Sequence, residues 1–256
     1  AGLGRPRVHH RLTDSTNERA RALALAGAPH GTLVTAEEQS SGRGRQGRRW
    51  EAPPGTALLA SLVVRDLDER HAVLPLTAAV ATCEACEAVA AVECRIKWPN
   101  DVWVKRRKVA GILLEGRPQE GWAVIGVGIN VSTRAEELPA GLRAAATSLA
   151  AAPPIHQEPP EPETVLEALL NALARRLQNP AEAVLAAWRA RDALAGERVR
   201  WDGRSGVAAG VAADGALLVD TSVGRLSLDA GEVHLESEPL GAGDEPPAGQ
   251  TSAGSA

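Results

Sequence analysis

The sequence contains no phenylalanine, tyrosine or methionine among its 256 residues. The hydrophobic core must therefore be built from aliphatic side chains and six tryptophans. Lysine is also scarce, because only three of the 28 basic residues are lysines, and these three, Lys97, Lys105 and Lys108, lie within twelve positions of one another. Arginine serves nearly everywhere else, so this cluster predicts sites that need a compact ammonium group rather than a broad guanidinium.

Long apolar runs are missing as well. No stretch approaches the roughly 20 apolar residues that a membrane helix needs, and the first residues show no apolar signal region. We therefore expect a protein of the cytoplasm without a membrane partner. The net charge of −4 argues against a general nucleic-acid binder, since the basic residues are not gathered into one strongly positive region.

Cysteine is represented by three residues, and an odd number in a chain of this length makes a disulfide framework unexpected. Cys83 and Cys86 have the spacing of a redox or metal motif. They lie in an alanine-rich helical pattern, however, and no second Cys or His pair follows nearby. This context argues against a metal site.

The most unusual segment is the loop Gly42-Arg43-Gly44-Arg45-Gln46-Gly47-Arg48-Arg49-Trp50, in which three glycines alternate with four arginines. Glycine lets backbone N–H groups turn toward a ligand, and arginine offers paired donors to carboxylate or phosphate oxygens. The loop therefore predicts anion binding, with a solvated basic turn as the alternative. It also matches the dinucleotide pattern G-x-G-x-x-G, but Pro53-Pro54-Gly55 follows where that pattern requires a helix.

Apolar periodicity predicts a sheet with flanking helices, followed by a smaller all-β region. Strands are expected at 8–10, 32–36, 57–64, 94–98, 108–115 and 122–128, and helices at 18–26, 75–92, 164–177 and 180–194. From Gly196 onward, short glycine-bounded strands predict a small barrel. We expect a main domain over 1–194, the barrel over 195–236 and a disordered tail over 237–256.

Three polar loops at predicted strand ends carry the remaining unusual residues: the arginine loop, Asn100 and Asp101 with Lys97 and Lys108, and the glycines before Asn130. Together such loops could hold a nucleotide. Arginines and backbone N–H groups suit phosphates, and a carboxylate suits Mg²⁺. Closely packed glycines before an amide side chain suit a ribose or a purine.

Five segments in this order resemble the motif series of biotin protein ligases. They are Asp14-Ser15-Thr16-Asn17, Gly42 to Arg48, Lys97-Trp98-Pro99-Asn100-Asp101, Lys108 to Glu115, and Gly126-Val127-Gly128-Ile129-Asn130. The resemblance implies an α+β fold, in which helices flank a mixed β-sheet of the class II synthetase-like type and an SH3-like barrel follows. It also implies that biotin and MgATP give biotinyl-5′-AMP, from which a lysine of a biotin carboxyl carrier domain takes the biotin.

The resemblance also assigns roles, with Lys108 and Arg45 as the catalytic residues. It assigns biotin binding to Ser15, Thr16, Asn17, Gln39, Arg43, Gly44, Arg45, Lys108 and Gly111. It assigns nucleotide binding to Arg43, Arg45, Arg48, Trp50, Lys97, Asn100 and Asn130, with Trp50 as an anchor of the loop. Asp101 would carry the Mg²⁺ that accompanies ATP.

Some features depart from the family or leave alternatives open. Only thirteen residues precede Asp14, so the sequence resembles the short ligases that lack a DNA-binding domain. Without Phe or Tyr, the apolar biotin wall and any stacking on adenine fall to tryptophan or aliphatic side chains. Lipoate ligases are the nearest rival family, and a non-catalytic binding protein is the rival from another class. A monomer and a homodimer both remain open, and the barrel is expected to serve transfer more than adenylation.

Overall fold

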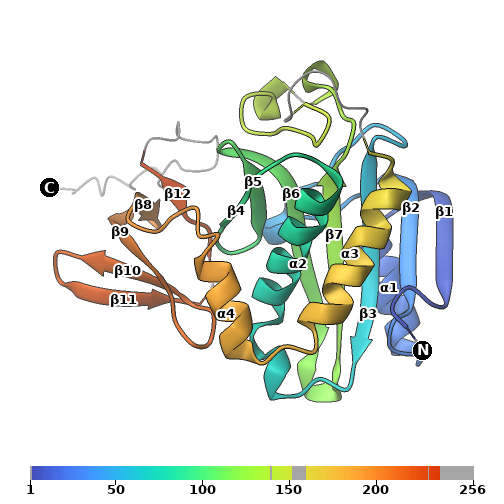
Figure 1. Ribbon diagram of the computed structural model, residues 1–256, viewed down its shortest axis with the longest axis horizontal. Helices are drawn as coiled ribbons and strands as arrows, with labels where there is room; N and C mark the ends of the chain where they lie inside the picture. The colour runs from blue at the N-terminus through green and yellow to red at the C-terminus, as the bar shows by residue number, and fades with distance from the viewer. Residues whose placement is uncertain (1, 139, 152–159, 230, 237–256) are drawn as a thin grey trace, which may run out of the picture.

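A computed structural model describes residues 2–138, 140–151, 160–229 and 231–236. The predicted tail at 237–256 lies outside these residues, and so does most of the proline-rich segment after Pro153. In the ribbon, a large sheet with its helices forms one part and a smaller sheet lies beside it (Figure 1). The division at residue 194 remains a prediction.

Within the described residues, the large sheet has seven strands in the order β1-β2-β3-β7-β6-β5-β4. The strands are β1 (Arg7–Thr13), β2 (Leu33–Gln39), β3 (Ala57–Arg65), β4 (Cys94–Lys97), β5 (Asp101–Val104), β6 (Arg107–Arg117) and β7 (Trp122–Asn130). The first pair, β1 and β2, is parallel and the others are antiparallel, so the sheet is mixed.

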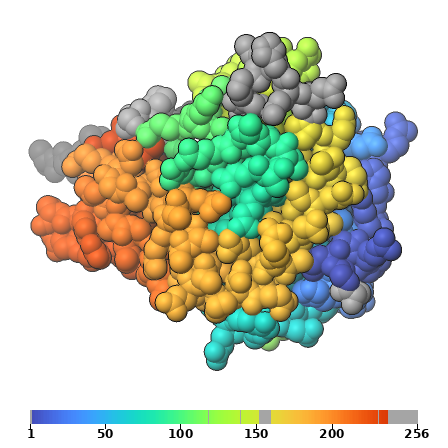
Figure 2. All heavy atoms as spheres, in the orientation of Figure 1, coloured from blue at the N-terminus to red at the C-terminus, as the bar shows by residue number. Residues whose placement is uncertain are grey.

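Helices cover both faces of this sheet. Neighbouring residues of a strand point to opposite faces, so each central strand packs against helices on both sides. Val34 and Val63 pack with α1 (Thr16–Leu25), whereas Leu33 and Leu62 belong to the larger core on the other face. That face carries α2 (Leu74–Val89), α3 (Pro162–Arg176) and α4 (Ala181–Arg189). Figure 2 shows α3 and α4 packed on either side of α2. The expected α+β fold with a helix-flanked mixed sheet is confirmed.

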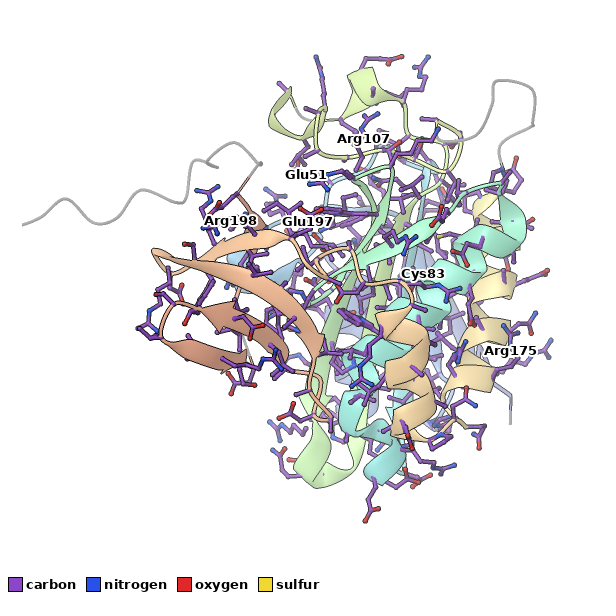
Figure 3. The ribbon with its side chains drawn as sticks, turned by 60° about the vertical axis from the view of Figure 1, so that its left-hand side comes forward. Glu51, Cys83, Arg107, Arg175, Glu197 and Arg198 are labelled. Atoms are coloured by element: carbon purple, nitrogen blue, oxygen red, sulfur yellow. The ribbon has the colours of Figure 1, made fainter. Side chains whose placement is uncertain are left out.

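The central helix α2 is the most deeply buried of these elements. Together with the short turn before it, the segment Glu69–Val89 is long and apolar enough to cross a membrane, which corrects the sequence-based statement that no stretch approaches this length. Since 67% of that window is buried inside the protein, we interpret it as a core helix. Cys83 and Cys86 lie on α2 as expected, and both are buried. Figure 3 labels Cys83 on this helix.

The helix predicted at 180–194 ends earlier, at Arg189. The Asp192 side chain accepts a hydrogen bond from the backbone N–H of Leu194, and backbone groups of Arg191 and Ala193 pair with Ile96 of β4. Residues 191–193 therefore extend the edge of the large sheet. The apolar spacing that suggested a longer helix reflects burial of Leu194 rather than helical structure.

The smaller sheet is antiparallel throughout, with the order β11-β10-β9-β8-β12 in the described part of the chain. Its strands are β8 (Arg198–Trp201), β9 (Arg204–Val211), β10 (Leu217–Thr221), β11 (Gly224–Leu228) and β12 (His234–Leu235). This arrangement is consistent with the expected SH3-like barrel. It is tied to the large sheet by Trp98, whose buried indole Nε1 donates to the backbone oxygen of Gly215 over 3.0 Å.

This connection can be measured. Trp98→Phe is expected to lower the free energy of unfolding by about 1–3 kcal/mol beyond the loss of ring volume, since the buried Gly215 carbonyl loses its donor. The matched control is Trp188→Phe, because the Trp188 indole is fully buried and its Nε1 has no hydrogen-bond partner among the described residues. Urea unfolding of both variants measures the difference, and equal losses of stability would contradict the role given to Trp98.

Candidate functional site

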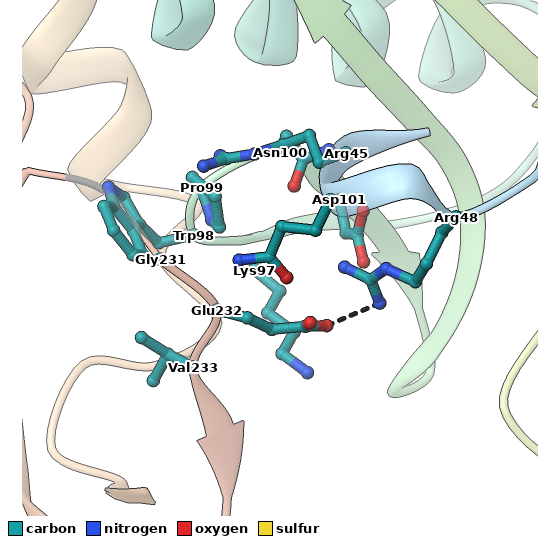
Figure 4. Close-up of a pocket in the computed structure, with 11 residues that line it drawn as sticks. Arg45, Arg48, Lys97, Trp98, Pro99, Asn100, Asp101, Gly231, Glu232 and Val233 are labelled. Atoms are coloured by element: carbon teal, nitrogen blue, oxygen red, sulfur yellow. Dashed lines mark ion pairs between the residues drawn. The ribbon is translucent and has the colours of Figure 1, made fainter. Parts of the chain in front are cut away.

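A pocket lies where the arginine loop, the turn after β4 and the C-terminal segment meet (Figure 4). Its lining consists of Arg45, Gln46, Arg48, Lys97, Trp98, Pro99, Asn100, Asp101, Gly231, Glu232 and Val233. Arg48 forms an ion pair of 2.5 Å with Glu232, which belongs to the C-terminal part. The C-terminal part therefore contributes a wall of the pocket, and the expectation that it serves transfer more than adenylation stays a prediction.

Positive charge dominates one side of this pocket. Arg45 is half-buried, and burial lowers the pKa of its guanidinium from the ordinary value. Asp101 and Glu232 oppose that shift, whereas the like charge of Arg48 adds to it. A desolvated arginine beside a second arginine gains from a bound anion, so the pocket favours a phosphate or carboxylate ligand.

Lys108 lies next to this pocket, paired with Asp101. Its Nζ is 2.7 Å from Oδ1 of Asp101 and 5.7 Å from the centroid of the Trp50 ring, and about a third of its side chain is exposed. The neighbouring Asn100 is held by strand β6, since its Nδ2 donates to the backbone oxygen of Ile112 over 2.8 Å. The sequence-predicted lysine and carboxylate are therefore in direct contact.

Trp50 lies across a strip of the sheet that has no side chains. A Cβ atom added at Gly128 would lie 2.6 Å from the indole ring, and one added at Gly111 would lie 3.0 Å from it. The backbone N–H of Trp50 donates to the oxygen of Gly42 over 3.0 Å, which closes the arginine loop. The interpretation of Trp50 as the anchor of the loop agrees with this placement, and its part in nucleotide binding remains a prediction.

A second polar cluster, the Thr16 cluster, surrounds the start of α1 and consists of Ser15, Thr16, Asn17, Gln39 and Ser61. The backbone N–H of Thr16 donates to Oε1 of Gln39 over 2.7 Å, and the Thr16 hydroxyl lies 3.1 Å from the same oxygen. Ser61 of β3 lies 2.8 Å from the Thr16 hydroxyl and 2.7 Å from Oδ1 of Asn17. Ser15, also buried, begins the helix beside them.

Ser61 was not identified from the sequence, although one signal was present. It is the single polar residue in the apolar run 57–64, which forms a buried strand. A hydroxyl in such a position needs a hydrogen-bond partner, and here it finds two on α1.

Strand register places the Thr16 cluster and the Lys108–Asp101 pair on one face of the sheet. Ser61 is opposite Gly126, and Gly128 is opposite Gly111, which is opposite Asp101. Gly126 and Gly128 are two residues apart and so face the same side, where Asn17 lies over Gly126 and Trp50 over Gly128. The Thr16 cluster, the covered glycine strip and the Asp101 pair therefore form one line across the sheet, suited to an elongated ligand with a polar head and an anionic end.

The remaining predicted residues have partners within the protein. Arg43 contacts Glu18 and lies 3.1 Å from Glu115, outside the pocket lining. Lys97 lies 4.9 Å above the ring of Trp103. The buried Asn130 donates from Nδ2 to the backbone oxygen of Thr147 over 3.0 Å. Gly44 pairs with Arg48 through its backbone N–H. Ligand contacts by these residues stay predictions.

Gly126 provides a test of the cluster. Its Cβ position overlaps Oδ1 of Asn17, so Gly126→Ala must displace the Asn17 side chain from its partners. We expect the free energy of unfolding to fall by about 1–3 kcal/mol, the cost of leaving buried polar groups unsatisfied. Gly141→Ala is the control, because a Cβ there meets nothing within 4 Å. Equal stability of the two variants in urea unfolding would show that Asn17 does not need this close approach.

Comparison with known proteins gives a consistent result. A family model described as the biotin/lipoate A/B protein ligase family matches residues 9–132. The biotin–[acetyl-CoA-carboxylase] ligase of Mycobacterium tuberculosis is 35% identical over 230 residues, which cover 86% of this chain and 81% of that protein. The bifunctional ligase/repressor BirA of Bacillus spizizenii is 38% identical over 155 residues, or 59% of this chain and 48% of that protein.

Among solved structures, the biotin protein ligase of Aquifex aeolicus in complex with biotin and ATP aligns with a TM-score of 0.77 and 27% sequence identity. The alignment covers 90% of this chain and 98% of the Aquifex chain. By contrast, the chain spans about half the length of the Bacillus ligase/repressor that it matches.

Proposed function

Because the chain belongs to the biotin protein ligase family, we propose that it activates biotin with MgATP and transfers the biotin to a lysine of a biotin carboxyl carrier domain. The observation that carries the proposal is the line across the sheet, which joins a polar cluster, a glycine strip and a cationic pocket. The name of the Mycobacterium relative supports a carrier domain as the acceptor. We place this reaction in the cytoplasm.

The biotin would follow that line. Its ureido head suits the Thr16 cluster, where Ser15, Gln39 and Ser61 offer hydroxyl and amide groups to its N–H and carbonyl groups. Its apolar rings and chain would lie along the glycine strip in the place of the Trp50 indole, which packs on Gly111 and Gly128 in the structure and would have to move aside. Its carboxylate would then end beside Lys108.

The triphosphate would occupy the cationic pocket. Arg45, Arg48 and Lys97 supply positive charge there. The described residues contain no group of three or more His, Cys, Asp or Glu side chains that could hold a metal by themselves. Mg²⁺ is commonly bound by one or two carboxylates together with substrate phosphates, and the single carboxylate of Asp101 fits that pattern. Bound there, Mg²⁺ would neutralise phosphate charge.

The chemical problem is to bring two anions together, and the residues answer it with fixed positive charge. In the first step a carboxylate oxygen of biotin attacks the α-phosphorus of ATP, and pyrophosphate leaves. Lys108 would contact both the carboxylate and the α-phosphate, with Arg45 and Arg43 holding the adenylate. In the second step the amine of the carrier lysine attacks the acyl carbon, loses a proton, and AMP leaves.

Biotin-dependent exchange of labelled pyrophosphate into ATP by the purified chain tests this proposal. We expect exchange with biotin and none with lipoate or octanoate at the same concentration. Exchange only with lipoate or octanoate would indicate a lipoate-type ligase. Biotin binding without exchange would indicate a non-catalytic binding protein, and biotinylation of an added carrier domain tests the transfer step separately.

A further inference from the structure

Glu115 connects two parts of the candidate site that the motifs treat separately. Its Oε2 accepts a hydrogen bond of 2.9 Å from Nδ2 of Asn17. Asn17 belongs to the Thr16 cluster, where the ureido head of biotin would bind and which we call the head-group site. Its Oε1 lies 3.1 Å from Nη2 of Arg43 in the arginine loop. The Glu115 side chain is 21% exposed, so one mostly buried carboxylate is shared between a helix and a loop.

The connection continues from Asn17 into the head-group site. Ser61 has a single hydroxyl proton, yet its oxygen lies within hydrogen-bond distance of both Thr16 and Asn17. If Ser61 donates to Asn17, its contact with Thr16 requires the Thr16 proton, which then leaves Gln39. A ligand that hydrogen-bonds to Thr16, Gln39 or Ser61 therefore stabilises one of these proton arrangements over the other.

That choice fixes Asn17. With Oδ1 accepting from Ser61, the Asn17 amide is held with Nδ2 toward Glu115. Without that bond the amide is held on its Nδ2 side alone, by Glu115 and by the backbone oxygen of Leu113 over 3.4 Å, so the neutral donor of Glu115 is less firmly placed while Arg43 stays. Hydrogen-bond chains of this kind transmit the state of one member to the next.

We propose that Glu115 is a positioning residue that couples occupancy of the head-group site to the position of Arg43, and so to the arginine loop. The inference rests on the proposed function, because it takes the Thr16 cluster as the place where biotin binds. Arg43 has a second partner, Glu18, which makes no hydrogen bond with Asn17 or Ser61 within the described part of the chain. The two carboxylates therefore hold the same arginine, but only Glu115 carries the connection to the head-group site.

This difference gives a matched pair of variants, Glu115→Gln and Glu18→Gln. Limited trypsin cleavage after the arginines of the loop, with and without biotin and in the absence of ATP, measures how strongly biotin protects the loop. The protection ratio is the cleavage rate without biotin divided by the rate with biotin. We expect Glu115→Gln to reduce this ratio at least fivefold. Glu18→Gln is expected to speed cleavage equally in both conditions and leave the ratio unchanged. An unchanged ratio in Glu115→Gln overturns the proposal.

A double-mutant cycle with Arg43→Ala separates coupling from a purely local effect on Asn17. By linkage, a loop that responds to biotin must also raise biotin affinity by the same factor. Glu115→Gln should therefore weaken biotin binding, measured calorimetrically, by about the factor lost in protection, and should add nothing in the Arg43→Ala background. Equal weakening in both backgrounds overturns the inference.

The same measurements separate this inference from the proposed function. A parent chain that binds no biotin overturns the proposed function, and this inference with it. A parent that binds biotin while Glu115→Gln shows equal effects in both backgrounds overturns only the inference. If Glu115→Gln does not fold, Glu115→Asp serves in the same cycle, because the shorter carboxylate cannot reach both Asn17 and Arg43.

Discussion

Lys108→Arg is expected to lower the rate of biotin-dependent pyrophosphate exchange by about 10²-fold or more, the scale seen when one transition-state donor is removed. The substitution keeps the charge but changes its shape. Lys108 Nζ lies 2.7 Å from Asp101, and its last carbon would lie 3.2 Å from a Cβ at Gly111. A planar guanidinium in this narrow place would contact one set of oxygens and displace the other.

Initial exchange rates at saturating biotin and ATP measure the effect, after urea unfolding has shown that the variant is folded. Lys105→Arg is the matched control, because Lys105 lies in the exposed turn between β5 and β6 and outside the pocket lining. We expect that control to keep the parent rate within twofold. A Lys108→Arg rate within a fewfold of the parent would reduce Lys108 to a general positive charge and make the lysine cluster a coincidence.

Local signals in the sequence were enough to predict most of the fold. The apolar runs at 57–64 and 122–128 are bounded by turn residues, and both form central strands, β3 and β7. Pro75 lies in the first turn of α2, where proline needs no N–H partner, so the start of that helix was also predictable. The end of α4 was not, because Asp192 and the pairing with Ile96 act through tertiary contacts.

The candidate site was predictable to the extent that its residues stand in polar loops at strand ends. The pairing of Asp101 with Lys108 follows from a turn between neighbouring strands. The parts that Ser61 and Glu232 play in the site could not be predicted, because they arise from the packing of segments that are distant in the sequence. Ser61 meets Asn17, 44 positions away, because α1 packs across β3 and β7, and Glu232 reaches Arg48 only when the smaller sheet has packed on the larger.

Arg45, one of the two loop arginines that line the pocket, leads to the last expectation. Arg45→Ala should increase the escape of biotinyl-5′-AMP by about 10- to 100-fold, because a hydrogen bond to a charged group contributes roughly 1.5–3 kcal/mol and each 1.4 kcal/mol is a factor of ten. Burial lowers the pKa of Arg45 and so favours its pairing with a ligand anion. We therefore expect the adenylate to lose more from this substitution than from loss of an exposed arginine.

The matched control is Arg49→Ala, since Arg49 belongs to the same loop but is exposed and lies outside the pocket lining. Both variants are supplied with biotin and ATP and no carrier domain, and the reaction is followed by the biotin that appears on lysines of an added bystander protein. Escaped adenylate acylates such lysines without the enzyme, so labelling reports escape rather than transfer. Labelling by Arg45→Ala that equals labelling by Arg49→Ala would show that Arg43 or another segment retains the adenylate.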